Sequence, residues 1–133
     1  MAFVLDASVS AVWALADESS LVADIAAKRL KTENALVPSL WWYEVRNLLI
    51  ISERRQRMTV AESAHYLELL SSFPIQVDRA EDEELVFQCA RQYKLSFYDA
   101  AYLAVALRNR LPMATLDKEL RAAAQIAGVS LLA

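Results

Sequence analysis

The segment Phe3-Val4-Leu5-Asp6-Ala7-Ser8-Val9 decides how this chain folds. A short apolar run, Ala2 to Leu5, is typical of a buried strand, and it ends abruptly on a carboxylate. In an open α/β sheet, ligands bind in the crevice beyond the carboxyl ends of the strands. Asp6 is therefore expected at that crevice, either as a functional acid or as the N-cap of the helix that follows.

The composition bounds the class of protein. With 133 residues, of which 56% are hydrophobic and 23% charged, we expect residues 1–133 to form a single domain with a substantial core. No apolar run approaches the roughly 20 residues that a membrane span needs, and the N-terminus lacks the pattern of a signal peptide. The single cysteine, Cys89, cannot form an internal disulfide. These features predict a cytoplasmic protein that has no membrane partner.

The net charge does not decide whether the protein binds nucleic acid. A value of −3 argues against a basic nucleic-acid binder. If four acids form one metal-binding cluster, however, 14 basic residues remain against 13 acidic ones. The single glycine, Gly128, excludes the glycine-rich phosphate loops of nucleotide-binding proteins.

Short apolar runs alternate with helical patterns along the whole chain. Strands are expected at 2–5, 35–37, 74–77, 111–116 and 129–132, and helices at 8–16, 20–31, 39–57, 59–70, 78–93, 96–107 and 118–127. Asp78 is expected to cap the fifth of these helices. This alternation predicts an α/β fold in three layers, with a short-stranded, mostly parallel central sheet and helices on both faces.

Four carboxylates occur at corresponding points of this architecture: Asp6 and Asp117 after strands, Asp99 in a first helical turn, and Glu44 within the helix at 39–57. Each has an ordinary structural alternative. The three aspartates suit helix caps. Glu44 shares a face with Leu40 and Leu48, but Trp41, Val45 and Leu49 form a competing apolar stripe that would leave it on the surface.

The functional interpretation depends on these acids converging in one pocket. The two strand-end aspartates would lie near one another if their strands are adjacent. Several acids in one cleft stay charged only if cations neutralise them. Oxygen ligands without histidine or cysteine select Mg²⁺ or Mn²⁺, and phosphodiester hydrolysis is the natural use of such a site.

Four segments resemble the PIN-domain family, specifically VapC-type toxin ribonucleases of type II toxin–antitoxin systems. The matching segments are Val4-Leu5-Asp6-Ala7-Ser8; Pro38 through Glu44 to Asn47-Leu48; Ser96-x-Tyr98-Asp99-Ala100-x-Tyr102-Leu103-Ala104-x-Ala106; and Leu111-Pro112-x-Ala114-Thr115-x-Asp117-x-x-Leu120. They follow the family's order over nearly the whole chain. The loop before Leu111 departs from the family in lacking glycine, so Asn109 and Arg110 must make that turn.

The resemblance implies a PIN-like fold and a catalytic, metal-binding quartet of Asp6, Glu44, Asp99 and Asp117, holding one or two Mg²⁺ or Mn²⁺ ions. It also implies that Ser8 supports the first aspartate, and we take Asn47 and Thr115 as further supporting side chains. By the same resemblance, the protein is a homodimeric endoribonuclease silenced by a cognate antitoxin. A metal-activated water would leave a 5′-phosphate and a 3′-hydroxyl on its RNA.

Alternatives remain open. Arg54, Arg55 and Arg57 are candidates for RNA contact, although cations also suit a helix C-terminus. A nuclease acting on DNA or in RNA maturation would use the same acids, and a catalytically silent binding module would keep the fold. Phosphoryl transfer through Asp6 as a covalent nucleophile is disfavoured, since Ser8 stands where the haloacid-dehalogenase pattern has a second aspartate.

Overall fold

A computed structural model describes residues 1–133. Its elements, in chain order, are β1 (Ala2–Leu5), α1 (Ala7–Ala14), α2 (Leu21–Arg29), β2 (Asn34–Pro38), α3 (Leu40–Arg54), α4 (Val60–Ser71), β3 (Ile75–Asp78), α5 (Glu83–Tyr93), α6 (Phe97–Asn109), β4 (Met113–Ala114) and α7 (Lys118–Ala127). No helix combines the length and the apolar character that crossing a bilayer requires.

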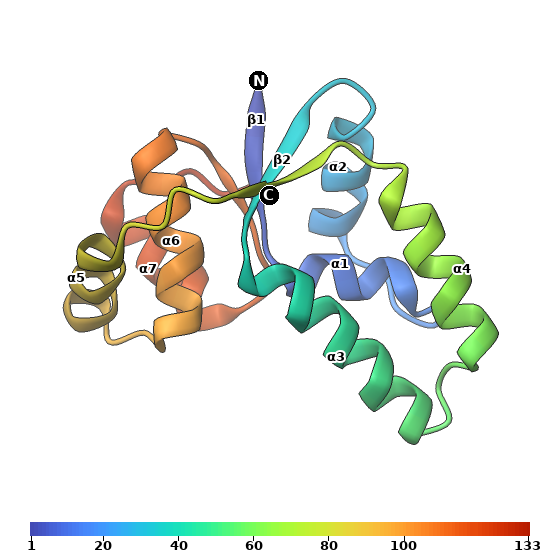
Figure 1. Ribbon diagram of the computed structural model, residues 1–133. Coiled ribbons are helices and arrows are strands. Elements are labelled where there is room, and N and C mark those ends of the chain that lie inside the picture. The colour runs from blue at the N-terminus through green and yellow to red at the C-terminus, as the bar shows by residue number, and fades with distance from the viewer.

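The strands form one four-stranded parallel sheet in the order β3-β2-β1-β4. Helices α1 to α4 lie on one side of the strands and α5 to α7 on the other, which gives three layers (Figure 1). The predicted α/β/α architecture is therefore confirmed. Because β1 is a central strand, Phe3, Val4 and Leu5 are fully buried.

Helix α6 packs closely on β1 and β2 because its inner face carries small side chains. Ala100 and Ala104 are buried there and allow the helix backbone to approach the sheet. Most helix starts follow the cap signals of the sequence. Ser20, Asp82, Ser96 and Asp117 cap their helices through side-chain oxygens, and Thr59 forms a full capping box with Glu62 in α4.

Two predictions are wrong in detail: the cap at Asp78 and the strand at 129–132. Asp78 does not cap α5; it ends β3, and its carboxylate pairs with Arg108 of α6, while Asp82 takes the cap position. The strand expected at 129–132 is reduced to a single bridge between Leu131 and Met113, because β4 is only two residues long and offers little edge for pairing.

The turn before β4 is made without glycine. Arg110 ends α6 in the left-handed conformation, with φ of 55°, and its backbone N–H donates to carbonyls of the last helical turn. Gly128 plays the same part at the end of α7, with φ of 80°, as its sequence position predicts.

Candidate active site

The carboxyl ends of β1 and β4 lie side by side at one edge of the sheet. Leu5 pairs with Ala114, and the backbone N–H of Asp6 donates to the Ala114 carbonyl at 3.0 Å. Asp6 and Thr115, the next residue of each chain segment, are therefore neighbours. Both are buried, and Asp6 is only 6% exposed.

Asp6 stands at the N-cap position of α1, but its side chain caps nothing. Its Oδ2 accepts hydrogen bonds from the hydroxyls of Ser8 and Thr115, both at 2.7 Å. The cap interpretation of Asp6 is therefore wrong, and the carboxylate is held instead by two hydroxyls at the sheet edge.

The same two hydroxyls also fix the segment that leads to Asp117. Thr115 Oγ1 accepts from the backbone N–H of Asp117 at 3.1 Å, and Ser8 Oγ accepts from the N–H of Leu116 at 3.0 Å. Asp117 Oδ1 then accepts from the N–H of Leu120 at 2.9 Å, so Asp117 does cap α7. Its Oδ2 makes no hydrogen bond to the protein.

Glu44 approaches from α3. Trp41, Val45 and Leu49 form the buried stripe of this helix, and the indole N–H of Trp41 donates to Ser10 Oγ at 3.0 Å. The competing stripe therefore faces the core, yet Glu44 is half-buried and not on the open surface. Its Oε1 accepts from the hydroxyl of Tyr102 on α6 at 2.6 Å.

Asp99 lies in the first turn of α6, and its side chain is partly buried. Ser96 caps this helix by accepting from the N–H of Asp99 at 3.1 Å. The capping box present in α4 is absent here, so the Asp99 carboxylate does not serve as a reciprocal cap.

Burial and repulsion from neighbouring acids both raise the pKa values of Asp6, Glu44 and Asp99. Burial raises the pKa of Asp6, and the nearby Asp117 adds to this, although the Ser8 and Thr115 donors lower it in part. Burial likewise raises the pKa of Glu44, with contributions from Asp6 and Asp99. Burial, Asp117 and Asp6 together raise the pKa of Asp99 to about 6. The structure thus brings all four predicted acids to one region.

The donor set suits a hard divalent cation, although no ready-made ligand shell is assembled. No group of three or more His, Cys, Asp or Glu side chains lies in an arrangement that could by itself hold a metal ion. Mg²⁺ does not require one, because it retains several waters and uses one or two carboxylates together with substrate phosphates. A cation would also relieve the mutual repulsion that raises these pKa values. The four carboxylates therefore have the chemistry that a Mg²⁺ or Mn²⁺ ion requires.

The other candidate residues divide into two groups. Ser8 and Thr115 contact Asp6 directly, whereas Asn47 is exposed and its side chain makes no hydrogen bond. Arg54 and Arg55 are exposed and form no ion pair, but Arg57 is paired with Asp17 and Glu18. Sequence reasoning missed Tyr102 as a site residue, since only the approach of α3 to α6 reveals its contact with Glu44.

A groove between α1 and α3 leads away from the acids. Ser8 and Leu116 lie at the end beside Asp6, and Arg55 and Arg57 line the groove farther along α3. The rest of the lining is mixed: Leu15 and Ile51 are apolar, whereas Asp17 and Glu18 are acidic.

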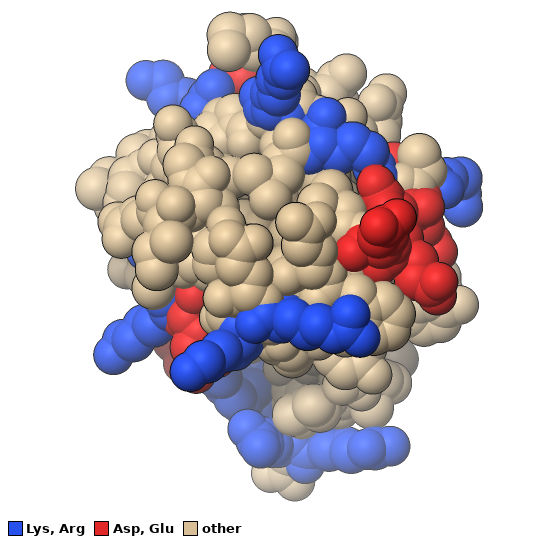
Figure 2. Space-filling model, turned by 90° about the vertical axis from the view of Figure 1, so that its left-hand side faces the viewer, with Lys and Arg blue, Asp and Glu red and all other residues tan.

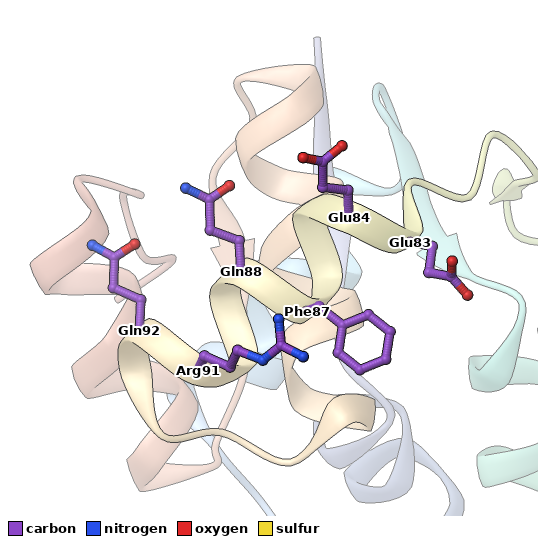
Figure 3. A pocket seen from close by; sticks show the side chains of 6 residues that line it. All are labelled: Glu83, Glu84, Phe87, Gln88, Arg91 and Gln92. Atoms are coloured by element: carbon purple, nitrogen blue, oxygen red, sulfur yellow. The ribbon is translucent and has the colours of Figure 1, made fainter.

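A second hollow lies on the outer surface of α5 and holds none of the four acids. Figure 3 shows that its side chains all project from this one helix, among them Phe87 and Arg91. Arg91 stacks on Phe87 with its guanidinium carbon 4.9 Å from the ring centroid. Glu83 and Glu84, in the first turn of α5, are exposed. On the face formed by α5 to α7, basic side chains lie in several groups separated by other residues, and acidic side chains lie beside some of these groups, so no continuous basic surface is seen there (Figure 2).

A family model described as the PIN domain matches residues 3–126. The chain belongs to the PIN-domain family. Exonuclease VapC9 from Pyrobaculum aerophilum is 38% identical to this PIN-domain protein over 91 residues, which cover 68% of this chain and 67% of that protein. The family resemblance and the relation to VapC proteins are thereby confirmed.

Two solved structures share the PIN fold of this chain. PAE2754 from Pyrobaculum aerophilum superposes with a TM-score of 0.76 and 25% identity, over 99% of this chain and 90% of that one. VapC20 from Mycobacterium tuberculosis, described as a toxin that cleaves the sarcin–ricin loop, has a TM-score of 0.61 and 16% identity, over 91% and 94% of the two chains. This PIN-domain protein is therefore a VapC-like nuclease homologue.

Proposed function

We propose that this protein is a metal-dependent endoribonuclease, the toxin of a toxin–antitoxin pair, and that residues 1–133 act as one PIN domain. The observation that carries this is that four separate segments bring Asp6, Glu44, Asp99 and Asp117 together. Beyond the effect of burial, Asp117 helps to raise the pKa of Asp6 and of Asp99, and Asp6 and Asp99 help to raise the pKa of Glu44. Acids that converge in this way at the carboxyl edge of a parallel sheet favour a site for a cation and a phosphate.

The four carboxylates are the residues that would hold Mg²⁺ or Mn²⁺. When bound, such an ion would neutralise phosphate charge and would supply a hydroxide nucleophile at neutral pH. The chain's own part is to orient the ligands. Ser8 and Thr115 fix Asp6, and the α7 cap fixes Asp117. Burial of Asp6 also limits the access of bulk water to this ligand.

The groove between α1 and α3 is the proposed path of the RNA strand. It begins at Ser8 and Leu116, beside the acids, and reaches Arg55 and Arg57. Arg54 and Arg55 are free to contact phosphates because neither is ion-paired. Arg57 is already neutralised by Asp17 and Glu18, so it is the weaker candidate.

An antitoxin and a second copy of the chain are the proposed protein partners. Large apolar side chains remain exposed on α3, including Trp42 at 47% and Tyr43 at 69% exposure. Trp41 is buried, so the Trp41–Trp42 pair divides between core and surface. Exposed apolar surface of this kind is typical of protein interfaces.

The test is cleavage of RNA by the purified protein in Mg²⁺ or Mn²⁺, beside D6N, D99N and an EDTA control. We expect activity to fall by more than about 100-fold in each variant, since even partners of metal ligands cost 10–100-fold. Cleavage that survives both substitutions or EDTA would rule out this site. A matched DNA substrate separates a ribonuclease from a DNA nuclease.

An exonuclease is the second candidate, because the 38% identical relative VapC9 carries that description. A covalently closed RNA circle distinguishes the two activities, as it has no end from which an exonuclease can start. An endonuclease linearises the circle and then shortens the products. An exonuclease leaves the circle intact but degrades the same RNA once it is linear.

A further inference from the structure

The four acids are held in different ways, and Glu44 is the one fixed by another helix. Asp6 is anchored by hydroxyls at the sheet edge, and Asp117 by the first turn of its own helix. Glu44 projects from α3, and its one hydrogen bond to the protein comes from Tyr102 of α6. Its place relative to the other acids therefore depends on a single side-chain contact.

Tyr102 is well suited to hold a carboxylate in place. Its side chain is only 1% exposed and is fixed in the core of α6, three residues after Asp99. Residues three apart lie on the same side of a helix, so Asp99 and Tyr102 share one face of α6. The hydroxyl donates to Glu44 Oε1 at 2.6 Å, and Oε2 makes no hydrogen bond to the protein.

We infer that Tyr102 is a positioning residue. It holds the Glu44 carboxylate of α3 in the place where it can bind a cation together with Asp99 of α6. This inference rests on the proposed function. A glutamate side chain has several rotatable bonds, and one oxygen held by a buried donor leaves the other oriented to act as a ligand. Without the hydroxyl, Glu44 would have to be ordered by the cation itself.

The decisive variant is Y102F, which keeps the buried ring and removes only the hydroxyl. Its matched control is Y66F, because Tyr66 is also buried and donates its hydroxyl to a different acceptor, the Ser10 carbonyl, at 2.6 Å. Mn²⁺ affinity is measured by calorimetry without RNA. We expect Y102F to bind Mn²⁺ about tenfold more weakly, and Y66F to bind it as the wild type does.

Cleavage assays and a double mutant test whether Tyr102 acts through Glu44. We expect the loss of RNA cleavage in Y102F to be largely recovered at high Mn²⁺. The double variant Y102F/E44Q should match E44Q within about twofold, since the hydroxyl has no role once the carboxylate is gone.

Three results would overturn the inference. If the wild type binds Mn²⁺ and Y102F binds it equally well, Tyr102 does not position a ligand, although the proposed nuclease site stands. Losses that simply add in Y102F/E44Q lead to the same conclusion. If the wild type itself binds no Mn²⁺, both the metal site and the role of Tyr102 fail.

Discussion

The hydroxyl of Thr115 lies 2.7 Å from Asp6 Oδ2, a contact between residues 109 positions apart in the chain. It exists because β1 and β4 are adjacent parallel strands that end at the same edge. The same hydroxyl accepts from the backbone N–H of Asp117. One buried threonine therefore links the environments of two of the acids.

Replacing this threonine with the nearly isosteric valine should destabilise the protein. T115V removes the donor to Asp6 and the acceptor of the Asp117 N–H, and an unsatisfied buried polar group costs about 1–3 kcal/mol. Urea unfolding measures the change. T32V is the control, because Thr32 is exposed and its hydroxyl makes only a long contact of 3.5 Å. Equal stability of the two variants would contradict the structural role of Thr115.

Divalent metal should stabilise the folded protein. A ligand that binds only the native state adds about 2.7 kcal/mol at 100 times its Kd, which for a chain of this size raises the Tm by roughly 10 °C. Thermal unfolding in Mg²⁺, compared with NaCl of equal ionic strength, measures this shift. D6N should lose most of it. An equal shift in the wild type and D6N would place metal binding elsewhere.

The metal-free protein should become less stable as the pH rises through the titration of Asp99. Burial, with Asp117 and Asp6, raises the pKa of this carboxyl to about 6, so the folded state holds its proton more tightly than the unfolded state. Its contribution to folding therefore falls between about pH 4 and pH 7.

D99N should remove that pH dependence. In EDTA at pH 7.5 it should be more stable than the wild type, by less than about 1 kcal/mol because Asp99 is partly exposed and screened. The advantage should disappear near pH 4, where the wild-type carboxyl is protonated. D24N is the control, since Asp24 lies exposed in the first turn of α2, where a negative charge favours the helix. Greater stability of the wild type at pH 7.5 would refute this prediction.

The ion pair between Asp78 and Arg108 should stabilise the attachment of β3 to α6. Burial raises the pKa of Asp78, but hydrogen bonds from Asn109, the Ala80 backbone and Arg108 outweigh it, so the pKa lies below its ordinary value of 3.8. D78N should therefore lower the free energy of unfolding by about 1 kcal/mol at pH 7.

This difference should vanish in acid. A depressed pKa contributes stability above the ordinary value, and the contribution is lost as the pH falls through the folded-state pKa. Urea midpoints of the wild type and D78N, measured at pH 7 and at steps down to pH 2, follow this loss. E33Q is the control, since Glu33 lies in the bend after α2 and pairs with Arg29 near the surface, where screening by solvent leaves an ion pair little effect on stability. If D78N costs no more than E33Q, the ion pair is no more than a surface contact.

The sequence predicted the features that residues close together in the chain determine, namely helix starts and short strands. The caps Thr59 and Ser96 begin helices where expected, and the run Ala2 to Leu5 forms β1. Asp78 was misassigned because a cap and a strand-end ion pair look alike until the position of Arg108 is known.

The sequence pattern also could not predict which face of α3 is buried. Two apolar stripes competed, and the bond from the Trp41 indole to the buried Ser10 accompanies the burial of the Trp41 stripe. The sequence resemblance selected the four acids, but Glu44 and Tyr102, which are 58 positions apart, meet only because α3 lies near α6 in the fold. Spacing along a single helix carries no information about such a contact.

The short strand β4 has a consequence for synthesis of the protein. Asp6 and Thr115 lie 109 positions apart in the chain, so the ribosome synthesises Asp6 long before Thr115 and Asp117. A nascent chain that ends before β4 lacks the strand against which the Asp6 segment pairs. The site that contains Asp6 and Asp117 can therefore form only after β4 has been synthesised.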